Sequence, residues 1–206
     1  IRDSHFDYLF IDVGPSLGPL NRSALLNSDY FFTPMASDIF SLLGVKNISN
    51  WIKGWAREYY AAICQTFPQT PFYTPDFYEK NLINCSETQL VKFAGYSIQQ
   101  YSGRKFKDGI RPTKSYEKVV KEVPGEVIKY LREFANKNIS DEDLMLGDIP
   151  YSYSVIPLSQ INNMPIFDLT YESGVRGGQT ASVESYKEYL EVIATNFLRN
   201  VGDTNE

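Results

Sequence analysis

The chain has 206 residues, a net charge of −5 at pH 7, an apolar content of 43% and a charged content of 22%. These values are ordinary for a globular domain with a buried core. The acidic balance argues against a nucleic-acid-binding coat over the whole surface, but not against a local basic patch. Cys64, Cys85 and the lone His5 cannot complete a zinc site. No apolar run is long enough to cross a bilayer.

The first part of the chain alternates predicted strands and helices. Residues 6–11 are a short, mostly apolar run that predicts a buried strand, and residues 20–26 predict a short helix. A second strand is expected at 30–33, ended by Pro34. Ser37 or Asp38 is a suitable N-cap for a long helix that reaches residue 59. Prolines then interrupt the chain, so residues from about 65 to 90 are expected to be a surface insertion or a partner-facing loop.

The second part continues the alternation. A third strand is expected at 93–101, and a basic stretch at 103–114 follows it. Helical periodicity covers 116–134, where Pro124 is expected to split it into two helices. Residues 151–156 predict a fourth strand ended by Pro157, and residues 180–198 predict an amphipathic final helix. This order predicts an α/β fold with a mainly parallel sheet, whose ligands would bind beyond the carboxyl ends of the strands.

Asp12 stands at the end of the first predicted strand. A carboxylate is costly to bury there alone, and a bound cation or a hydrogen-bond network would remove that cost. In P-loop NTPases an apolar strand that ends in aspartate holds the Mg²⁺ that bridges the nucleotide phosphates. An apolar run followed by aspartate is also a common strand end or helix cap, so the pattern alone leaves both interpretations open.

Residues 6–45 resemble the Walker B region of ParA/MinD-type ATPases and are nearest to the ParA partition branch. The matching positions include Asp7-Tyr8, Asp12, the Pro15–Gly18 turn, Pro34, and Asp38 with the residues up to Val45. Residues 153–197, with an Ile156-Pro157 turn, are similar to the family's closing strand, adenine-side loop and final helix. Gly14 and Asp38 stand where the family prefers proline and glutamate, and residues 51–89 have no counterpart.

The resemblance implies a three-layer, P-loop NTPase-like α/β fold with a mainly parallel sheet. Residues 1–206 would form a single C-terminal portion of such a domain, incomplete at its N-terminal side. The family's phosphate-binding loop, Lys-Gly-Gly-x-Gly-Lys-Thr/Ser, lies upstream of Walker B and does not occur in this sequence. The chain alone is therefore expected to be inactive and to bind no cofactor tightly, whereas the whole protein would hydrolyse ATP with Mg²⁺.

The resemblance also implies roles for individual residues. Asp12 would be the catalytic residue and would hold Mg²⁺, through water. Gln99 and Pro157 would contact the nucleotide. Ser16 and Asp38 would contact the residues that bind the ion or the nucleotide, rather than the ligands themselves. In the ParA branch, ATP-bound dimers bind DNA without sequence preference, and a partner protein stimulates hydrolysis. The implied partners are a second copy, non-specific DNA and a partition-type activator, in the bacterial cytoplasm and at the nucleoid if DNA is bound.

The basic stretch is the candidate DNA contact. Five cations stand there against the single acid Asp108, and a DNA phosphate backbone would suit them. An ordinary solvated loop remains the alternative. The candidates are Arg104, Lys105, Lys107, Arg111 and Lys114.

Two other functions remain open from the sequence. One is a non-enzymatic or degenerate nucleotide-binding module that binds a protein partner through its aromatic insertion, which Gly14, Asp38 and the divergent loop after Pro157 would allow. The other is a MinD-like relative that acts at a membrane. The chain ends in acidic and polar residues rather than in a basic amphipathic helix, so the sequence favours a protein that has no membrane partner.

Overall fold

The computed structural model describes residues 6–14, 18–66, 75–80, 90–101, 103–106, 109–112, 114–152 and 154–202. The chain falls into two compact units. The first comprises Ile1–Asp29 and Asn50–Val91, and the second comprises Tyr30–Ser49 and Lys92–Glu206. Helix α2 (Ile39–Thr66) contributes residues to both units.

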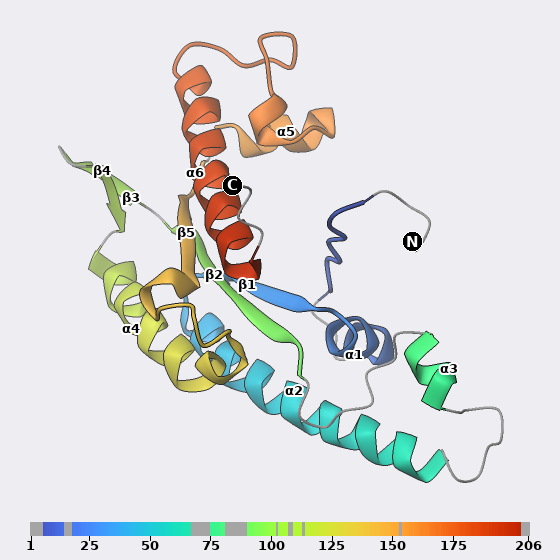
Figure 1. The fold of residues 1–206 in the computed structure, drawn as a ribbon. Helices are drawn as coiled ribbons and strands as arrows, with labels where there is room; N and C mark the ends of the chain where they lie inside the picture. The colour runs from blue at the N-terminus through green and yellow to red at the C-terminus, as the bar shows by residue number, and fades with distance from the viewer. Residues whose placement is uncertain are drawn as a thin grey trace. The chain divides into compact units, whose positions relative to one another are not determined.

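A parallel sheet forms the centre of the second unit (Figure 1). Its strands lie in the order β1 (Tyr30–Ala36), β2 (Lys92–Tyr101) and β5 (Met145–Pro150). Residues 93–98 of the central strand β2 are all buried, as expected for a parallel strand that is covered on both faces. The prediction of an α/β fold with a parallel sheet is confirmed, and the architecture is consistent with part of a P-loop NTPase-like fold.

Two neighbouring phenylalanines of β1 show which elements cover the sheet. Phe31 packs edge-on against Phe134 at a centroid distance of 6.2 Å, whereas Phe32 packs against Phe197 at 5.8 Å. Successive residues of a strand point to opposite faces. Helix α6 (Gln179–Val201) therefore covers one face, and the end of α4 (Lys114–Leu131), continued by η1 (Arg132–Phe134), covers the other.

Helix α4 is continuous, so the expected division at Pro124 is wrong. Its residues Val123, Val127 and Leu131 are spaced by four and are 0% exposed. A proline inside a helix removes one main-chain hydrogen bond. Burial of this apolar stripe outweighs that loss, because each fully buried side chain contributes about 1.5–3 kcal/mol.

Two of the three register shifts in the sheet have a glycine beside the extra residue. The register between β1 and β2 shifts at Ala94 and resumes at Gly95, which has a φ of +140°. The register between β2 and β5 shifts at Leu146 and resumes at Gly147, with a φ of +157°. A Cβ at Gly95 would lie 2.6 Å from the Leu144 carbonyl oxygen, so only glycine fits there.

Two strand boundaries differ from the sequence-based prediction. Pro34 lies inside β1 rather than at its end, which is tolerated because β1 is an edge strand of the described sheet. The strand expected at 151–156 is wrong, because the strand is β5 at Met145–Pro150. Its Leu146 and Ile149 enter the core, whereas the chain turns at residues 154–155 and continues as α5 (Ile156–Asn162).

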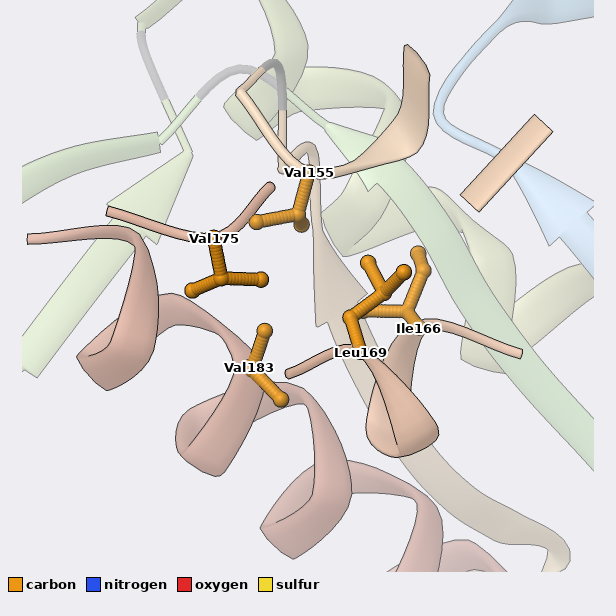
Figure 2. Close-up of a cluster of buried hydrophobic side chains, with 5 residues drawn as sticks. All are labelled: Val155, Ile166, Leu169, Val175 and Val183. Atoms are coloured by element: carbon orange, nitrogen blue, oxygen red, sulfur yellow. The ribbon is translucent and has the colours of Figure 1, made fainter. Parts of the chain in front are cut away.

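A small apolar cluster organises the chain between β5 and α6. The segment passes through α5 and η3 (Ile166–Asp168) before α6 begins. Five side chains from α5's N-cap, η3, the following loop and α6 meet there, and Ile156, Leu158 and Tyr186 pack against them. Figure 2 shows the cluster: Val155, Ile166, Leu169, Val175 and Val183.

The strand predicted at residues 6–11 is wrong. Residues 6–14 are described as an exposed, irregular segment, in which Phe6, Leu9 and Phe10 are 79%, 62% and 65% exposed. A strand requires a neighbour that accepts its main-chain hydrogen bonds. High β-propensity alone therefore does not make this segment a strand.

Helix α1 (Pro19–Leu26) confirms the short helix predicted in the first unit. The Arg22 guanidinium lies 5.1 Å from the Trp55 ring centre and 3.7 Å from a Glu58 carboxylate oxygen. Trp51 stacks on Trp55 with an interplanar angle of 12°. α1 is thus held to the second half of α2 by a cation–π contact and an exposed ion pair.

The remaining described elements are short. Helix α3 (Pro75–Lys80) is the described part of the expected insertion, of which residues 67–74 and 81–89 lie outside the described residues. β3 (Gly103–Phe106) and β4 (Gly109–Pro112) form an antiparallel hairpin, and η2 (Glu142–Leu144) precedes β5.

Candidate functional site at the carboxyl edge of the sheet

The carboxyl ends of the parallel strands meet in one row. Gln99 of β2 is the register partner of Ala36 in β1 and of Ile149 in β5. Because all three strands run in the same direction, the segments that follow them leave the same edge of the sheet. This edge is where open α/β sheets bind their ligands.

Gln99 occupies the centre of this row. Its side chain is partly exposed, and its Nε2 donates a hydrogen bond to the Ser97 Oγ at 3.2 Å. Ser97 is 1% exposed. The hydrogen bond directs the Gln99 amide along β2. A bound ligand could accept a hydrogen bond from the same Nε2 without a change in the main chain.

Asp38 lies two residues beyond β1, close in sequence to the same row. One of its carboxylate oxygens accepts a hydrogen bond from the Ser41 main-chain N–H at 2.8 Å. This is an N-cap contact at the start of α2, as predicted, and it satisfies one of the free N–H groups of the first turn. Asp38 therefore has a structural role in the described state, and its expected supporting role in a nucleotide site is a separate proposal.

Pro157 lies in the first turn of α5, not at the end of a strand. Proline fits that position because its fixed φ suits a helix and its missing N–H would have no partner there. The Pro157 side chain is exposed. The Ile156-Pro157 pair is thus a helix start, and the turn expected after a fourth strand is wrong.

Asp12 lies on the exposed segment 6–14 and not at the end of a described strand. Ser16 lies outside the described residues. Within the part of the chain that the structure describes, no group of three or more histidine, cysteine, aspartate or glutamate residues could hold a metal ion. Mg²⁺ typically uses one or two protein carboxylates plus substrate phosphates, so the Asp12 carboxylate fits such an ion only together with a bound nucleotide.

The basic stretch folds as the β3–β4 hairpin. In its register Arg104 is opposite Arg111, and Lys105 is opposite Ile110. Lys114 is the first residue of α4, and Lys107 lies outside the described residues. The sequence indicated the cluster of charge but not its antiparallel pairing.

A groove between α2 and α4 was not predicted from the sequence. It has a volume of about 400 Å³ and is lined by apolar residues of α2 and by charged residues of both helices. The spacing of apolar residues in both helices predicted that each helix has a buried face. It did not predict a groove between them. The lining residues are Ile39, Leu42, Leu43, Lys46, Lys121, Glu122, Gly125 and Glu126.

Among the described residues, none of the helices has the length and apolarity that a membrane span needs.

The parallel sheet, its carboxyl-edge row and the flanking helices form an α/β fold that is consistent with part of a P-loop NTPase-like fold. A family model described as an AAA domain matches residues 1–63, and that model represents a ParA/MinD-like P-loop family. The match covers Asp12, α1, β1 and most of α2. No curated protein matches the chain.

One solved structure extends the likeness over the chain. It is the crystal structure of protein DIP2308 from Corynebacterium diphtheriae, with a TM-score of 0.59 and 21% sequence identity. The alignment covers 98% of this chain and 51% of that one, so the chain spans about half the length of the structure that it matches. At this identity the likeness shows the fold alone.

Proposed function

We propose that this chain is the C-terminal part of a ParA-like ATPase, whose whole protein uses ATP-dependent dimerisation to bind and position DNA. The observation that carries the proposal is the family match over residues 1–63, because it includes the aspartate of the Walker B pattern. The row formed by Ala36, Gln99 and Ile149 supports it, since it supplies the strand edge at which such a ligand would bind.

When bound, Mg²⁺ would neutralise charge on the nucleotide phosphates. The Asp12 carboxylate would hold the ion by accepting hydrogen bonds from its water shell. The Gln99 amide exchanges its bond with Ser97 for one with the base. The capped N-terminus of α2, with Asp38, holds the segment after β1 in position. Ser16 and Pro157 are the other residues for which the resemblance implies a role at the nucleotide.

The proposal includes partners and a location. A second copy of the protein, non-specific DNA and a partition-type activator would act together, in the bacterial cytoplasm at the nucleoid. Sedimentation of the whole protein tests the dimerisation step. With Mg²⁺ and a non-hydrolysable ATP analogue we expect a dimer, and with ADP a monomer. Asp12→Ala should remove the difference, and the control Asp76→Ala, at an exposed aspartate of α3 in the stretch without a family counterpart, should keep it. An equal mass in both nucleotides would overturn the proposal.

A second candidate is an interaction module that binds a protein partner without ATP turnover. Asp38 favours this second candidate, because one of its carboxylate oxygens accepts a hydrogen bond from the Ser41 main-chain N–H in a helix cap. The aromatic insertion at about 65–90 would then carry the binding surface. Nucleotide-independent binding that survives Asp12→Ala but not removal of the insertion would support this candidate.

A further inference from the structure

The groove between α2 and α4 lies beside exposed apolar side chains. Ile39 and Leu43 line the groove and are 58% and 56% exposed, whereas Leu42 between them is buried. Phe40 is 77% exposed and lies three residues before Leu43, so the two side chains are neighbours on the helix surface. Adjacent apolar side chains exposed to this degree mark an interaction surface. The first turns of α2 thus carry both a hollow and an exposed aromatic ring.

Gly125 keeps the α4 side of the groove open. It is one of the lining residues, and a Cβ added to it would meet nothing within 4 Å. A glycine inside a helix lowers stability relative to alanine, and the packing around this position leaves room for a methyl group. The close approach of a second molecule to the α4 main chain would make the glycine necessary.

The charges of the groove favour a second copy as the molecule that binds there. Lys46 lies on α2 and Glu122 on α4, and both are exposed. Among the described residues, neither of them takes part in an ion pair, whereas a Glu126 carboxylate oxygen lies 3.5 Å from the Lys129 Nζ. A uniformly acidic or basic ligand would match only one of the two free charges. A second copy in a two-fold contact would match both, because Lys46 of each copy would face Glu122 of the other.

We propose that the α2–α4 groove binds a second copy of this chain, with Phe40 of each copy over Gly125 of the other and Lys46 opposite Glu122. The contact includes neither Asp12 nor the carboxyl-edge row, so it does not require nucleotide and goes beyond the proposed ATP-dependent dimerisation. It joins few side chains, which places it among small, weak interfaces that separate on dilution. Such a contact raises the effective concentration of one copy near another.

Sedimentation equilibrium of the whole protein without nucleotide, over a dilution series, tests the proposal. The wild type should associate reversibly as concentration rises. Phe40→Ser should weaken self-association about tenfold or more, because the side chain at the centre of the contact is removed. Ile161→Ser is the matched control, since Ile161 is 78% exposed on α5 and does not line the groove. Equal losses in the two variants would overturn the proposal and indicate non-specific apolar association.

A charge exchange tests the two-fold pairing. Lys46→Glu and Glu122→Lys should each weaken self-association about tenfold, because like charges then face each other at both ends of the contact. An equimolar mixture of the two variants should regain the wild-type affinity, since every facing pair again carries opposite charges. Failure of the mixture to associate more tightly than either variant alone would overturn the two-fold contact.

A variant of Gly125 separates binding from folding. Gly125→Ala should raise the urea midpoint, because alanine favours the helix and its methyl group has room. It should still weaken self-association, because the methyl group occupies space that Phe40 of the second copy needs. Unchanged association, or weaker association with a lowered midpoint, would overturn the role of Gly125.

The wild type gives the last discriminating result. Monomers at every concentration without nucleotide would overturn the inference, and the surface would then be covered by another part of the whole protein or by a different protein. That result leaves the proposed function intact. The proposed function is tested separately at a dilution where the protein without nucleotide is monomeric, by addition of Mg²⁺ and the ATP analogue.

Discussion

The Asn200 side-chain amide donates a hydrogen bond to the Ala94 main-chain carbonyl at 2.8 Å and links helix α6 to the central strand across 106 residues of sequence. The same nitrogen donates to the Asp143 carbonyl, also at 2.8 Å, and Asn200 is 3% exposed. One buried amide thus satisfies two carbonyls next to the β2 bulge, where the regular ladder is interrupted.

Asn200→Ala should lower the free energy of unfolding by about 2–3 kcal/mol, because it leaves two acceptors without their donor. Urea unfolding followed by circular dichroism measures the loss. Asn196→Ala is the matched control one turn earlier on α6, since Asn196 makes a single, partly buried bond to the Leu146 carbonyl. It should cost about 1 kcal/mol. Equal costs for the two variants would contradict the importance assigned to Asn200.

Gly95→Ala should destabilise the protein by more than about 2 kcal/mol, because the φ of +140° and the carbonyl 2.6 Å from the added Cβ leave no relaxed position. Gly54→Ala, in the middle of α2 with nothing within 4 Å of the added carbon, should stabilise by about 0.5–1 kcal/mol. Thermal melts of both variants provide the comparison. A neutral Gly95→Ala would show that the bulge can rearrange.

Burial raises the pKa of Tyr96 to about 12. The unfolded chain releases this proton near pH 10 and the folded chain only near 12, so unfolding releases a proton in between and stability falls as pH rises through that window. The contribution is fully present below about pH 10. Tyr96→Phe should flatten the fall in urea midpoint between about pH 9 and 12, whereas Tyr171→Phe, at a 72% exposed position, should not. Parallel curves for wild type and Tyr96→Phe would contradict the burial effect.

Asp38→Ala should cost about 1 kcal/mol through loss of the α2 N-cap, and Asp38→Asn should restore most of it because asparagine caps equally well. The same two variants test whether Asp38 has a role beyond the cap. If ATP turnover of the whole protein follows stability in both, the role is structural. A loss of turnover in the stable Asp38→Asn variant would instead place the negative charge itself in the nucleotide site.

The helices and the central strand were readily predicted from local sequence. The α6 periodicity, the Asp38 cap and the β2 run all depend on interactions within or beside the element itself. The predictions failed where a distant element decided the outcome. Residues 6–11 have strand propensity but do not form a strand in the structure. Pro124 stays within α4 because its neighbours on that helix are buried in the core.

The candidate site was predicted less completely than the fold. The position of Gln99 near the carboxyl end of its strand was predicted correctly, because the strand-like run of residues in the sequence shows where the strand ends. Pro157 was assigned to the wrong element, since an Ile-Pro pair is compatible with both a strand end and a helix start. The pairing of Arg104 with Arg111 depends on the register of the hairpin, which the local sequence does not specify.

The central claim is that Asp12 belongs to the Mg²⁺-dependent ATP site of the whole protein, and the turnover of ATP tests it most directly. Steady-state phosphate release should fall to background in Asp12→Ala at saturating ATP and Mg²⁺, because the ion would lose the carboxylate that the protein supplies. Asp76→Ala, at an exposed aspartate of α3, should retain the wild-type rate. Unchanged turnover in a folded Asp12→Ala protein would contradict the account.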